Sequence, residues 1–215
     1  MPLANRVTPF GELFATAARG TLMGNRGGHF HADDKTLTTR RWASPQWICC
    51  VLEFKNRQRD VWGRYYTELF FLDEVTAFAA GHRPCFECRR KDAEHFARFF
   101  ASEGRRRASA PDMDDVLHRE RLDGRAKRMH CTGIDMLPDG AMIAIDGEAF
   151  AVRGDWLLHW TAKGYGAPQL RPRGVEADVL TPPSIVSVLA RGYAPLWHPS
   201  AGSLSSATAA APGAT

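Results

Sequence analysis

The sequence predicts an α+β protein in which a lobe of one hairpin and several helices precedes a β-rich lobe with one C-terminal helix. Three observations lead to this prediction. Short runs rich in aromatic and β-branched residues, typical of strands, lie at 47–54 and 64–72. Stretches with the apolar spacing of amphipathic helices follow them. The second half opens with alternating apolar residues around an Asp-Gly pair at 146–147, which is typical of a β-hairpin.

The chain is long enough for a sizeable core, because it has 215 residues of which 44% are hydrophobic. We expect a first lobe over residues 1–130, a second lobe over 131–198 and a disordered tail over 199–215. Leu204 is the only large apolar residue of that tail. No apolar run of about 18 residues occurs, and the N-terminus lacks an apolar signal core. We therefore expect no membrane span and a cytoplasmic location.

In the first lobe, residues 13–18 are expected to form a short helix, and the Gly-rich stretch 23–31 a loop. The two strands at 47–54 and 64–72 are expected to pair as an antiparallel hairpin with a long connection. Asp73 is a suitable N-cap for a helix over 74–80, which Gly81 would end. Further helices are expected over 89–102 and 112–123.

In the second lobe, strands are expected at 141–145, 149–152 and 156–161, followed by a loop over 164–174. Another strand is expected over 175–180. Thr181 and Pro182 precede an apolar helical pattern that runs to Ala190 and is closed by Gly192. This is the single helix predicted for the second lobe.

The motif that indicates chemistry is Gly81-His82-Arg83-Pro84-Cys85-Phe86-Glu87-Cys88, between two predicted helices. Cysteines three residues apart can both reach one tetrahedral zinc ion, with sulfur about 2.3 Å from the metal. The N-terminus of the following helix favours negatively charged sulfur. A redox role is not favoured, because the preceding pattern is a hairpin and a helix rather than a βαβ unit. Cys85 and Cys88 are therefore predicted to bind zinc.

Two further ligands remain to be chosen. Cys49 and Cys50 are adjacent on a predicted strand, so their side chains point to opposite faces and one of them can reach the ion. Cys50 shares the more apolar side of that strand, which favours it over Cys49. His31, on the Gly-rich stretch, is our first choice for the fourth ligand. The alternatives are His29, His82, His130 and Cys131.

The stretch from Phe70 to Cys88 resembles the N-terminal metal-binding domain of the Ada-type proteins that repair methylated DNA phosphotriesters. The likeness consists of an aromatic pair on a strand and of Ala77-Phe78-Ala79-Ala80-Gly81-His82-Arg83-Pro84-Cys85-Phe86-Glu87-Cys88. It implies zinc ligation by Cys85 and Cys88, a small mixed α/β zinc domain over roughly 20–105, and a DNA-contacting surface nearby. The family's upstream Cys-x-x-x-Cys is missing here, so its methyl transfer to cysteine is not carried over. The likeness spans about twenty residues and leaves out the chain beyond about residue 130.

Charge is unevenly distributed along the chain. Residues 1–131 hold 23 Lys and Arg against 17 Asp and Glu, a balance of +6, whereas residues 132–215 hold 5 against 7, a balance of −2. Arginine grips phosphate with two parallel hydrogen bonds, so an Arg-rich first half favours contact with DNA or RNA. The arginines chosen as candidates are Arg40, Arg41, Arg83, Arg89 and Arg90.

The sequence is compatible with three functions. The first is a protein whose zinc is mainly structural and whose first half binds nucleic acid, without catalysis. The second is a zinc enzyme, such as a hydrolase, a nuclease or an alkyl-acceptor repair protein. A water-activating site for it could use His29, His31, His130, Asp33 and Asp34. The third is a non-catalytic adaptor that binds a protein partner through Trp156, Trp160, Tyr165, Tyr193 and Trp197.

Overall fold

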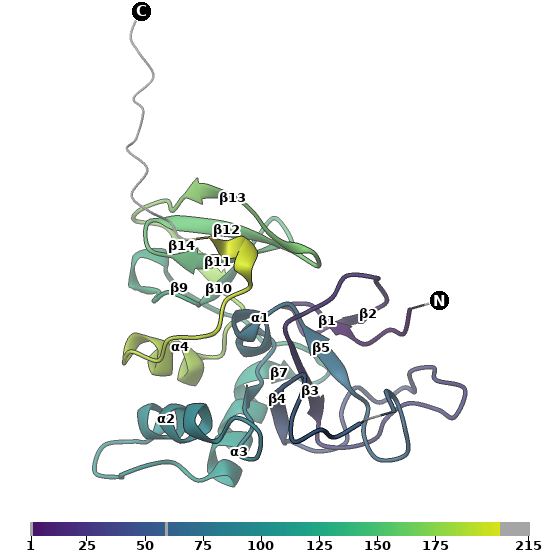
Figure 1. Ribbon diagram of the computed structural model, residues 1–215. Coiled ribbons are helices and arrows are strands. Elements are labelled where there is room, and N and C mark those ends of the chain that lie inside the picture. The colour runs from purple at the N-terminus through teal and green to yellow at the C-terminus, as the bar shows by residue number, and fades with distance from the viewer. Residues whose placement is uncertain (1, 59, 203–215) are drawn as a thin grey trace, which may run out of the picture.

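The computed structural model describes residues 2–58 and 60–202, which form four α-helices and two six-stranded sheets. Figure 1 shows the second sheet above the helices, with the first sheet beside α1. The predicted α+β class, with a β-rich second part and a C-terminal helix, is therefore confirmed. No helix among the described residues is long and apolar enough to span a membrane.

The first sheet has the strand order β2-β1-β5-β3-β4-β6. Most neighbours are antiparallel, but β1 runs parallel to β5 and β4 runs parallel to β6. The strand bounds are β1 Arg6–Val7, β2 Leu13–Phe14, β3 Leu22–Arg26, β4 Trp47–Val51, β5 Leu69–Phe71 and β6 Arg83–Pro84.

The predicted pairing of the strands at 47–54 and 64–72 is wrong, because β3 lies between β4 and β5 and pairs with both. Residues 22–26 were expected to belong mostly to a loop, since Gly24 and Asn25 are poor strand formers. Gly24 is required by close packing. A Cβ there would lie 2.1 Å from the carbonyl oxygen of Ile48 and 2.8 Å from the Phe71 ring. The helix expected over 13–18 is also wrong, because Leu13–Phe14 is a strand.

The helices of the first lobe follow the predictions closely. They are α1 Glu74–Ala79, α2 Arg90–Phe100 and α3 Ala110–Arg121. The Asp73 carboxylate caps α1 by accepting a hydrogen bond from the Thr76 N–H at 2.9 Å. Ser109 caps α3 in the same way, through the N–H of Asp112 at 3.3 Å. A two-stranded hairpin then follows α3, with β7 Leu122–Asp123 and β8 Ala126–Lys127.

The second sheet has the order β13-β12-β11-β10-β14-β9. Asp146 and Gly147 both have positive φ, as the two-residue turn between β10 and β11 requires. The loop expected over 164–174 is largely a strand, and its Pro168 is tolerated because β13 lies at the sheet edge. The bounds are β9 His130–Gly133, β10 Met142–Ile145, β11 Glu148–Arg153, β12 Trp156–Thr161, β13 Gly164–Leu170 and β14 Glu176–Val179. The remaining elements are α4 Pro183–Ala190, η1 Ile134–Met136 and η2 Pro199–Ala201.

The two predicted lobes share hydrophobic core. Leu72, Val75 and Ala79 from the first lobe pack with Met142 and Leu158 from the second. Helix α4 packs on α2 and α3, in a second cluster around Phe96. The predicted disorder of 199–215 is wrong at its start, where Pro199–Ala201 forms the 3-10 turn η2, and residues 203–215 lie outside the described residues.

Candidate metal centre

Three of the predicted site residues come together: Cys50, Cys85 and Cys88. Their sulfur atoms all lie within 4.8 Å of one another. Sulfur atoms on one tetrahedral zinc ion lie about 3.8 Å apart, so a spacing within 4.8 Å is compatible with three bonds to one ion. Within residues 2–58 and 60–202, this is the only group of three or more His, Cys, Asp or Glu side chains so arranged. This group, called the thiol cluster below, could hold a metal ion.

Backbone pairing builds the thiol cluster from two segments. Cys50 lies on β4, and Cys85 directly follows β6, which runs parallel to β4. The Cys85 N–H donates to the carbonyl of Cys49 at 3.0 Å, which holds the Cys-x-x-Cys turn against β4. The Arg89 N–H donates to the carbonyl of Cys85 at 3.0 Å and closes the turn that carries Cys88 into α2.

The three thiols alter one another's protonation. Hydrogen bonds from the Cys50 and Cys88 thiols lower the pKa of Cys85, whereas the bonds that Cys50 donates, together with burial, raise the pKa of Cys50. The N–H of Glu87 also donates to the sulfur of Cys85 at 3.4 Å. A thiolate is thereby stabilised at Cys85, and the thiolate is the form that binds metal. Sulfur donors select zinc, Cu(I) or iron–sulfur clusters over magnesium or calcium.

Cys49 lies outside the thiol cluster because it points to the opposite face of β4. Its sulfur is fully buried in a core cluster with Leu69 and Phe71, and it accepts a hydrogen bond from Nη1 of Arg89 at 3.3 Å. Burial raises the pKa of Cys49. The main core therefore lies on the Cys49 side, so the apolar-face argument that favoured Cys50 was wrong, although Cys50 is the residue in the cluster.

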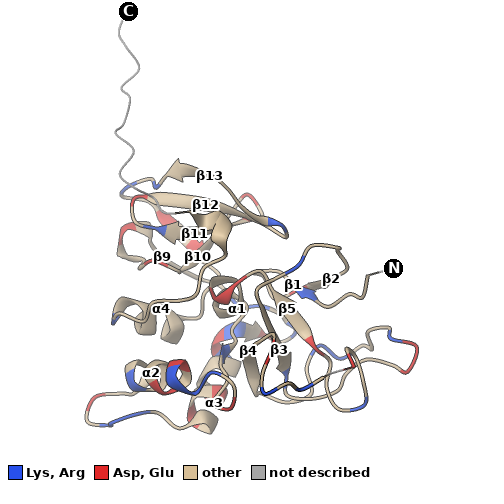
Figure 2. Cartoon of the chain, in the orientation of Figure 1, with Lys and Arg blue, Asp and Glu red and all other residues tan. Residues whose placement is uncertain are grey.

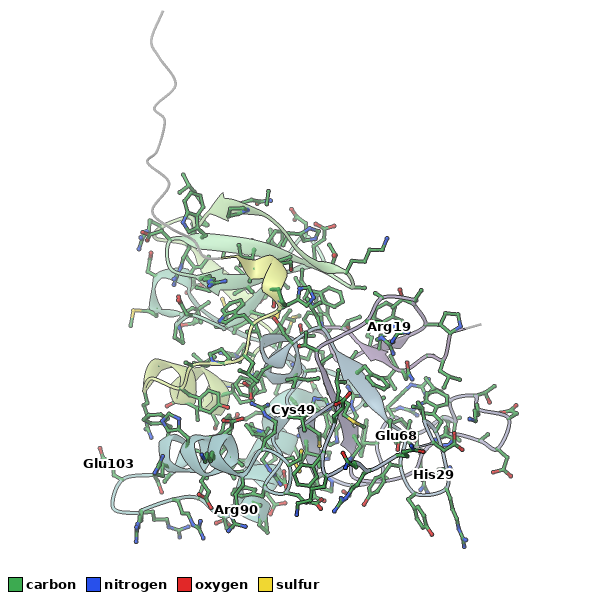
Figure 3. All side chains as sticks on the ribbon, viewed as in Figure 1. Arg19, His29, Cys49, Glu68, Arg90 and Glu103 are labelled. Carbon is green, nitrogen blue, oxygen red and sulfur yellow. The ribbon has the colours of Figure 1, made fainter. Side chains whose placement is uncertain are left out.

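His31 does not join the thiol cluster. Its Nδ1 lies 2.8 Å from the Thr67 hydroxyl and its Nε2 lies 3.0 Å from the carbonyl of Trp62. Both ring nitrogens are thus occupied, and burial lowers the pKa of His31. Figure 3 labels His29, two residues away in the chain, apart from Cys49. The expectation that His31 supplies a fourth ligand is not met.

The remaining candidate ligands are also elsewhere. Cys131 and His130 lie on β9 in the second sheet, and the exposed Cys131 thiol donates to a Glu176 carboxylate at 3.5 Å. His82 is fully buried and its ring packs against those of Trp47 and Phe71. The five-residue water-activating site is not assembled either, since His130 belongs to the other sheet.

Two of the predicted nucleic-acid contacts are interior ion pairs. Arg83 donates two hydrogen bonds to Asp114, at 2.8 and 2.7 Å, and is 2% exposed. Arg89 is 4% exposed and lies 2.7 Å from Glu74 and 2.8 Å from Asp92. Neither can reach a ligand at the surface, so those two assignments were wrong. Arg40, Arg41 and Arg90 are exposed, and Figure 2 shows further basic residues along α2 and its connection to α3.

Three of the five aromatic residues proposed as an adaptor surface instead fasten the second lobe to α1. The Tyr165 hydroxyl donates to Asp73 at 2.9 Å, and the Tyr193 hydroxyl donates to Glu74 at 3.0 Å. The indole N–H of Trp160 donates to the Thr76 hydroxyl at 3.0 Å. The polar groups of these three rings are thus already hydrogen-bonded within the chain.

Sequence reasoning named Arg41 but missed the other members of a group of basic residues on the other side of β4. A cavity there is lined by Arg26, Arg41, Arg121, Arg125 and Lys127, together with Trp47. Trp47 shares the face of Cys49, so the cavity lies on the opposite face from Cys50. One feature of the sequence could have indicated this cavity: Arg26 is a charged residue within the stretch that forms the buried strand β3.

Comparison of the chain with protein-family models, with curated proteins and with solved structures gave no match. The resemblance to the Ada-type metal-binding domain therefore stays a prediction from residues 70–88.

Proposed function

We propose that this protein binds one zinc ion through Cys50, Cys85 and Cys88, that the ion is mainly structural, and that the first lobe contacts nucleic acid. The observation that carries the proposal is the convergence of three sulfur atoms from β4 and from the turn before α2. Three thiols offer the soft anionic donors that zinc prefers, and few other protein sites need them so close together.

A structural role follows from what the cluster joins. Cys50 belongs to β4, while Cys88 leads directly into α2, so an ion held by both ties the sheet to the helix. Met23 packs against Cys50 and Cys85, with Phe70 partly buried beside them. Zinc in such a place would stabilise the folded chain, because the unfolded chain has no preformed site.

Nucleic-acid contact is supported by the charge of the first half and by the exposed arginines. Arg40 and Arg41 lie in the connection between β3 and β4, next to the half-buried ring of Trp42. A guanidinium beside an aromatic ring suits a phosphate next to a base. Arg90 is exposed but pairs with Glu94 at 3.0 Å, so it is the weaker candidate.

Metal analysis of protein purified without chelators tests the zinc site. We expect one equivalent of zinc in the native chain and in Cys131→Ser, and a loss of most of it in Cys85→Ser. Cys131→Ser is the matched control, because it removes an exposed thiol from the second lobe. Native protein free of metal would refute the proposal.

Gel-shift titration with single-stranded DNA and RNA tests the second part. We expect the binding constant to fall steeply with salt, since neutralised phosphates release counterions. An absence of binding at low salt would remove nucleic acid from the proposal and leave the zinc site untouched.

The number of sulfur donors favours a second candidate, a reactive zinc centre. A structural zinc site has four protein ligands, whereas only three potential ligands gather among the described residues. A fourth position open to water or substrate would suit a hydrolase, or an alkyl acceptor. In the latter, a thiolate would attack the methyl carbon of a methylated phosphotriester, forming an S–C bond and releasing the phosphodiester anion. Mass spectrometry after incubation with methylated DNA tests the alkyl acceptor, because the structural role predicts unmodified Cys50, Cys85 and Cys88.

A further inference from the structure

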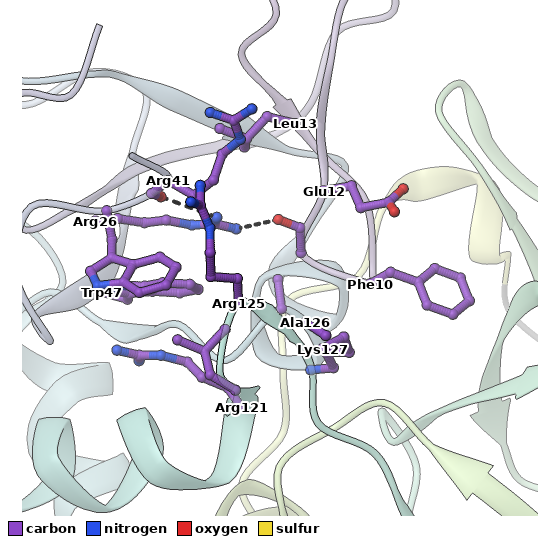
Figure 4. A pocket seen from close by; sticks show the side chains of 14 residues that line it. Phe10, Glu12, Leu13, Arg26, Arg41, Trp47, Arg121, Arg125, Ala126 and Lys127 are labelled. Atoms are coloured by element: carbon purple, nitrogen blue, oxygen red, sulfur yellow. Dashed lines mark hydrogen bonds between the residues drawn. The ribbon is translucent and has the colours of Figure 1, made fainter. Parts of the chain in front are cut away.

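The basic cavity on the far side of β4 has a volume of about 500 Å³ and is drawn in Figure 4. Five basic side chains and one acidic side chain line it. They come from separate segments, because Arg26 ends β3, Arg121 ends α3, and Arg125 and Lys127 belong to the β7–β8 hairpin. The fold thus gathers cations that are scattered along the sequence. This feature is called the basic pocket below.

Two of these arginines are buried against one tryptophan. Arg26 is 2% exposed and Arg121 is 1% exposed. Their guanidinium carbons lie 4.0 and 3.9 Å from the centre of the Trp47 ring. Hydrogen bonds to backbone carbonyls fix both in place, with Arg26 bonded to Gly11 at 2.8 Å and Arg121 to Gly81 at 2.9 Å. The guanidinium groups are therefore rigidly placed.

No carboxylate neutralises the basic pocket. None of its five cations forms an ion pair among the described residues. Figure 4 shows the exposed Glu12 side chain directed away from Arg26 and Arg121. Asp114, the other acid near Arg121, already accepts two bonds from Arg83. Burial of unpaired cations costs several kcal/mol each, so such a group calls for an anion.

Two of the residues that line the basic pocket also have unused hydrogen-bond donors. The Nε of Arg121 and the indole Nε1 of Trp47 are buried without any hydrogen-bond partner. Both groups can only donate, so only an acceptor can satisfy them. Buried polar groups in folded proteins are rarely left unpaired.

The electrostatics are those of a crowded cationic site. Burial, and then repulsion from Arg41, lowers the pKa of Arg26 to about 9. Burial and the nearby Arg26 lower the pKa of Arg121 to about 8, and burial together with both arginines lowers the pKa of Lys127 to about 7. An anion bound among them would reverse these shifts, because an opposite charge favours the protonated form.

We propose that the basic pocket binds a phosphate monoester, with the phosphate among Arg26, Arg121 and Lys127. A dianion matches several guanidinium and ammonium donors better than a single carboxylate does. The cavity is larger than inorganic phosphate requires, which leaves room for an organic group against Trp42, Phe10 and Leu13. A shallower cavity shares Arg41, Trp42 and Arg125 with the basic pocket and extends it toward Arg40.

The phosphate ester can come from a free nucleotide or from the terminal phosphate of a single-stranded nucleic acid. Only the second source rests on the proposed function. The probes are inorganic phosphate, AMP, a 5′-phosphorylated tetranucleotide and the same tetranucleotide without its phosphate. Calorimetry and thermal unfolding of the full chain at low salt measure their binding.

We expect AMP or the phosphorylated tetranucleotide to bind at least tenfold more tightly than the unphosphorylated tetranucleotide. Arg125→Gln and Lys127→Gln together should weaken binding of the phosphorylated probe at least tenfold. Arg125 is exposed, and Lys127 is partly buried in the short β7–β8 hairpin with its Nζ donating to the Ala79 carbonyl, a bond that the Gln amide can replace, so this variant should fold. The matched control is Arg106→Gln, which removes an exposed charge between α2 and α3 and should change binding less than twofold.

Each outcome decides the matter. Binding of phosphate or AMP without binding of any oligonucleotide supports the pocket and rejects nucleic acid as the source. Equal binding of AMP and of both tetranucleotides, or no binding of any phosphorylated probe at millimolar concentration, overturns the pocket. An equal loss in Arg106→Gln also overturns it. Zinc content is measured on the same samples, so failure of the metal site is seen separately.

Discussion

In the part of the chain that the structure describes, each face of strand β4 carries buried groups that lack a partner, and the missing partner has opposite charge on the two faces. On one face Cys50 joins Cys85 and Cys88, three sulfur donors that together suit a cation. On the other face Trp47 lies between Arg26 and Arg121, two buried cations that lack an anion. One strand separates them because its side chains alternate. The described residues supply no partner of opposite charge for these buried groups. Their chemistry therefore indicates that one face binds a cation and the other an anion.

The largest effect is expected when the thiol cluster is broken. Cys85→Ser, or extraction of the metal with a strong chelator, should lower the free energy of unfolding by about 4 kcal/mol or more, since zinc binding is coupled to folding. Chemical denaturation measures this loss. Cys131→Ser should stay within about 0.5 kcal/mol of the native chain, as exposed substitutions do. Equal stability of the chelated and native proteins would make the cluster irrelevant to the fold.

A smaller effect is expected from the buried ion pair between Arg83 and Asp114. Asp114→Asn leaves the guanidinium buried without its counter-charge, which should cost about 3 kcal/mol of unfolding free energy. Glu94→Gln is the matched control, because it breaks the exposed pair with Arg90 and should cost about 0.5 kcal/mol or less. If Asp114→Asn were as stable as the native chain but bound nucleic acid more weakly, Arg83 would be indicated as a nucleic-acid contact.

The basic pocket predicts a dependence on pH. The pKa of Lys127 falls from its ordinary 10.5 to about 7 in the folded chain. Between these values the unfolded chain binds more protons, so raising the pH stabilises the folded chain, by at most about 1.4 kcal/mol per pH unit. Arg26 and Arg121 cause the shift besides burial, and Arg125 and Glu12 line the same cavity.

Unfolding in phosphate-free buffer at pH 7 and pH 9 measures this contribution as the difference between the native chain and Lys127→Met. Lys91→Met serves as the control, because Lys91 is exposed on α2. Saturation with AMP should reduce this pH-dependent difference in unfolding free energy, because a bound anion favours the protonated form of Lys127. If the free energy of unfolding depended on pH equally in the native chain and in Lys127→Met, the lowered pKa of Lys127 would be contradicted.

The smallest effect is expected at the surface. Arg40→Gln should weaken binding of single-stranded nucleic acid about two- to threefold, as the loss of one phosphate contact does. Arg90→Gln should have less effect, because Arg90 already pairs with Glu94. Gel shifts at two salt concentrations compare them, and a larger loss in Arg90→Gln would move the interface to α2.

What the sequence reveals differs between the two faces for a physical reason. Cys85 and Cys88 stand in one turn with metal-ligand spacing, so the sequence alone identified them, and alternation limited the choice to Cys49 or Cys50. The basic pocket has no local signature, since its residues meet only in the folded chain. The helices were predicted because their caps and apolar spacing are local. Strand β3 was missed because Gly24 serves a close approach to Ile48 and Phe71 that no local pattern records.

Burial explains the other errors. Arg83 and Arg89 look like surface cations in a sequence, and only the fold supplies Asp114 and Glu74 beside them. His31 has the chemistry of a ligand, yet Thr67 and Trp62 occupy both its nitrogens. Such partners come from distant segments, which composition and spacing do not reveal.

Native mass spectrometry of never-chelated protein tests the central claim most directly, with the adjacent variants Cys50→Ser and Cys49→Ser as a pair. We predict one bound zinc in the native chain and in Cys49→Ser, and little or none in Cys50→Ser. A metal-free native chain, or a metal that is lost in Cys49→Ser and kept in Cys50→Ser, would contradict the account.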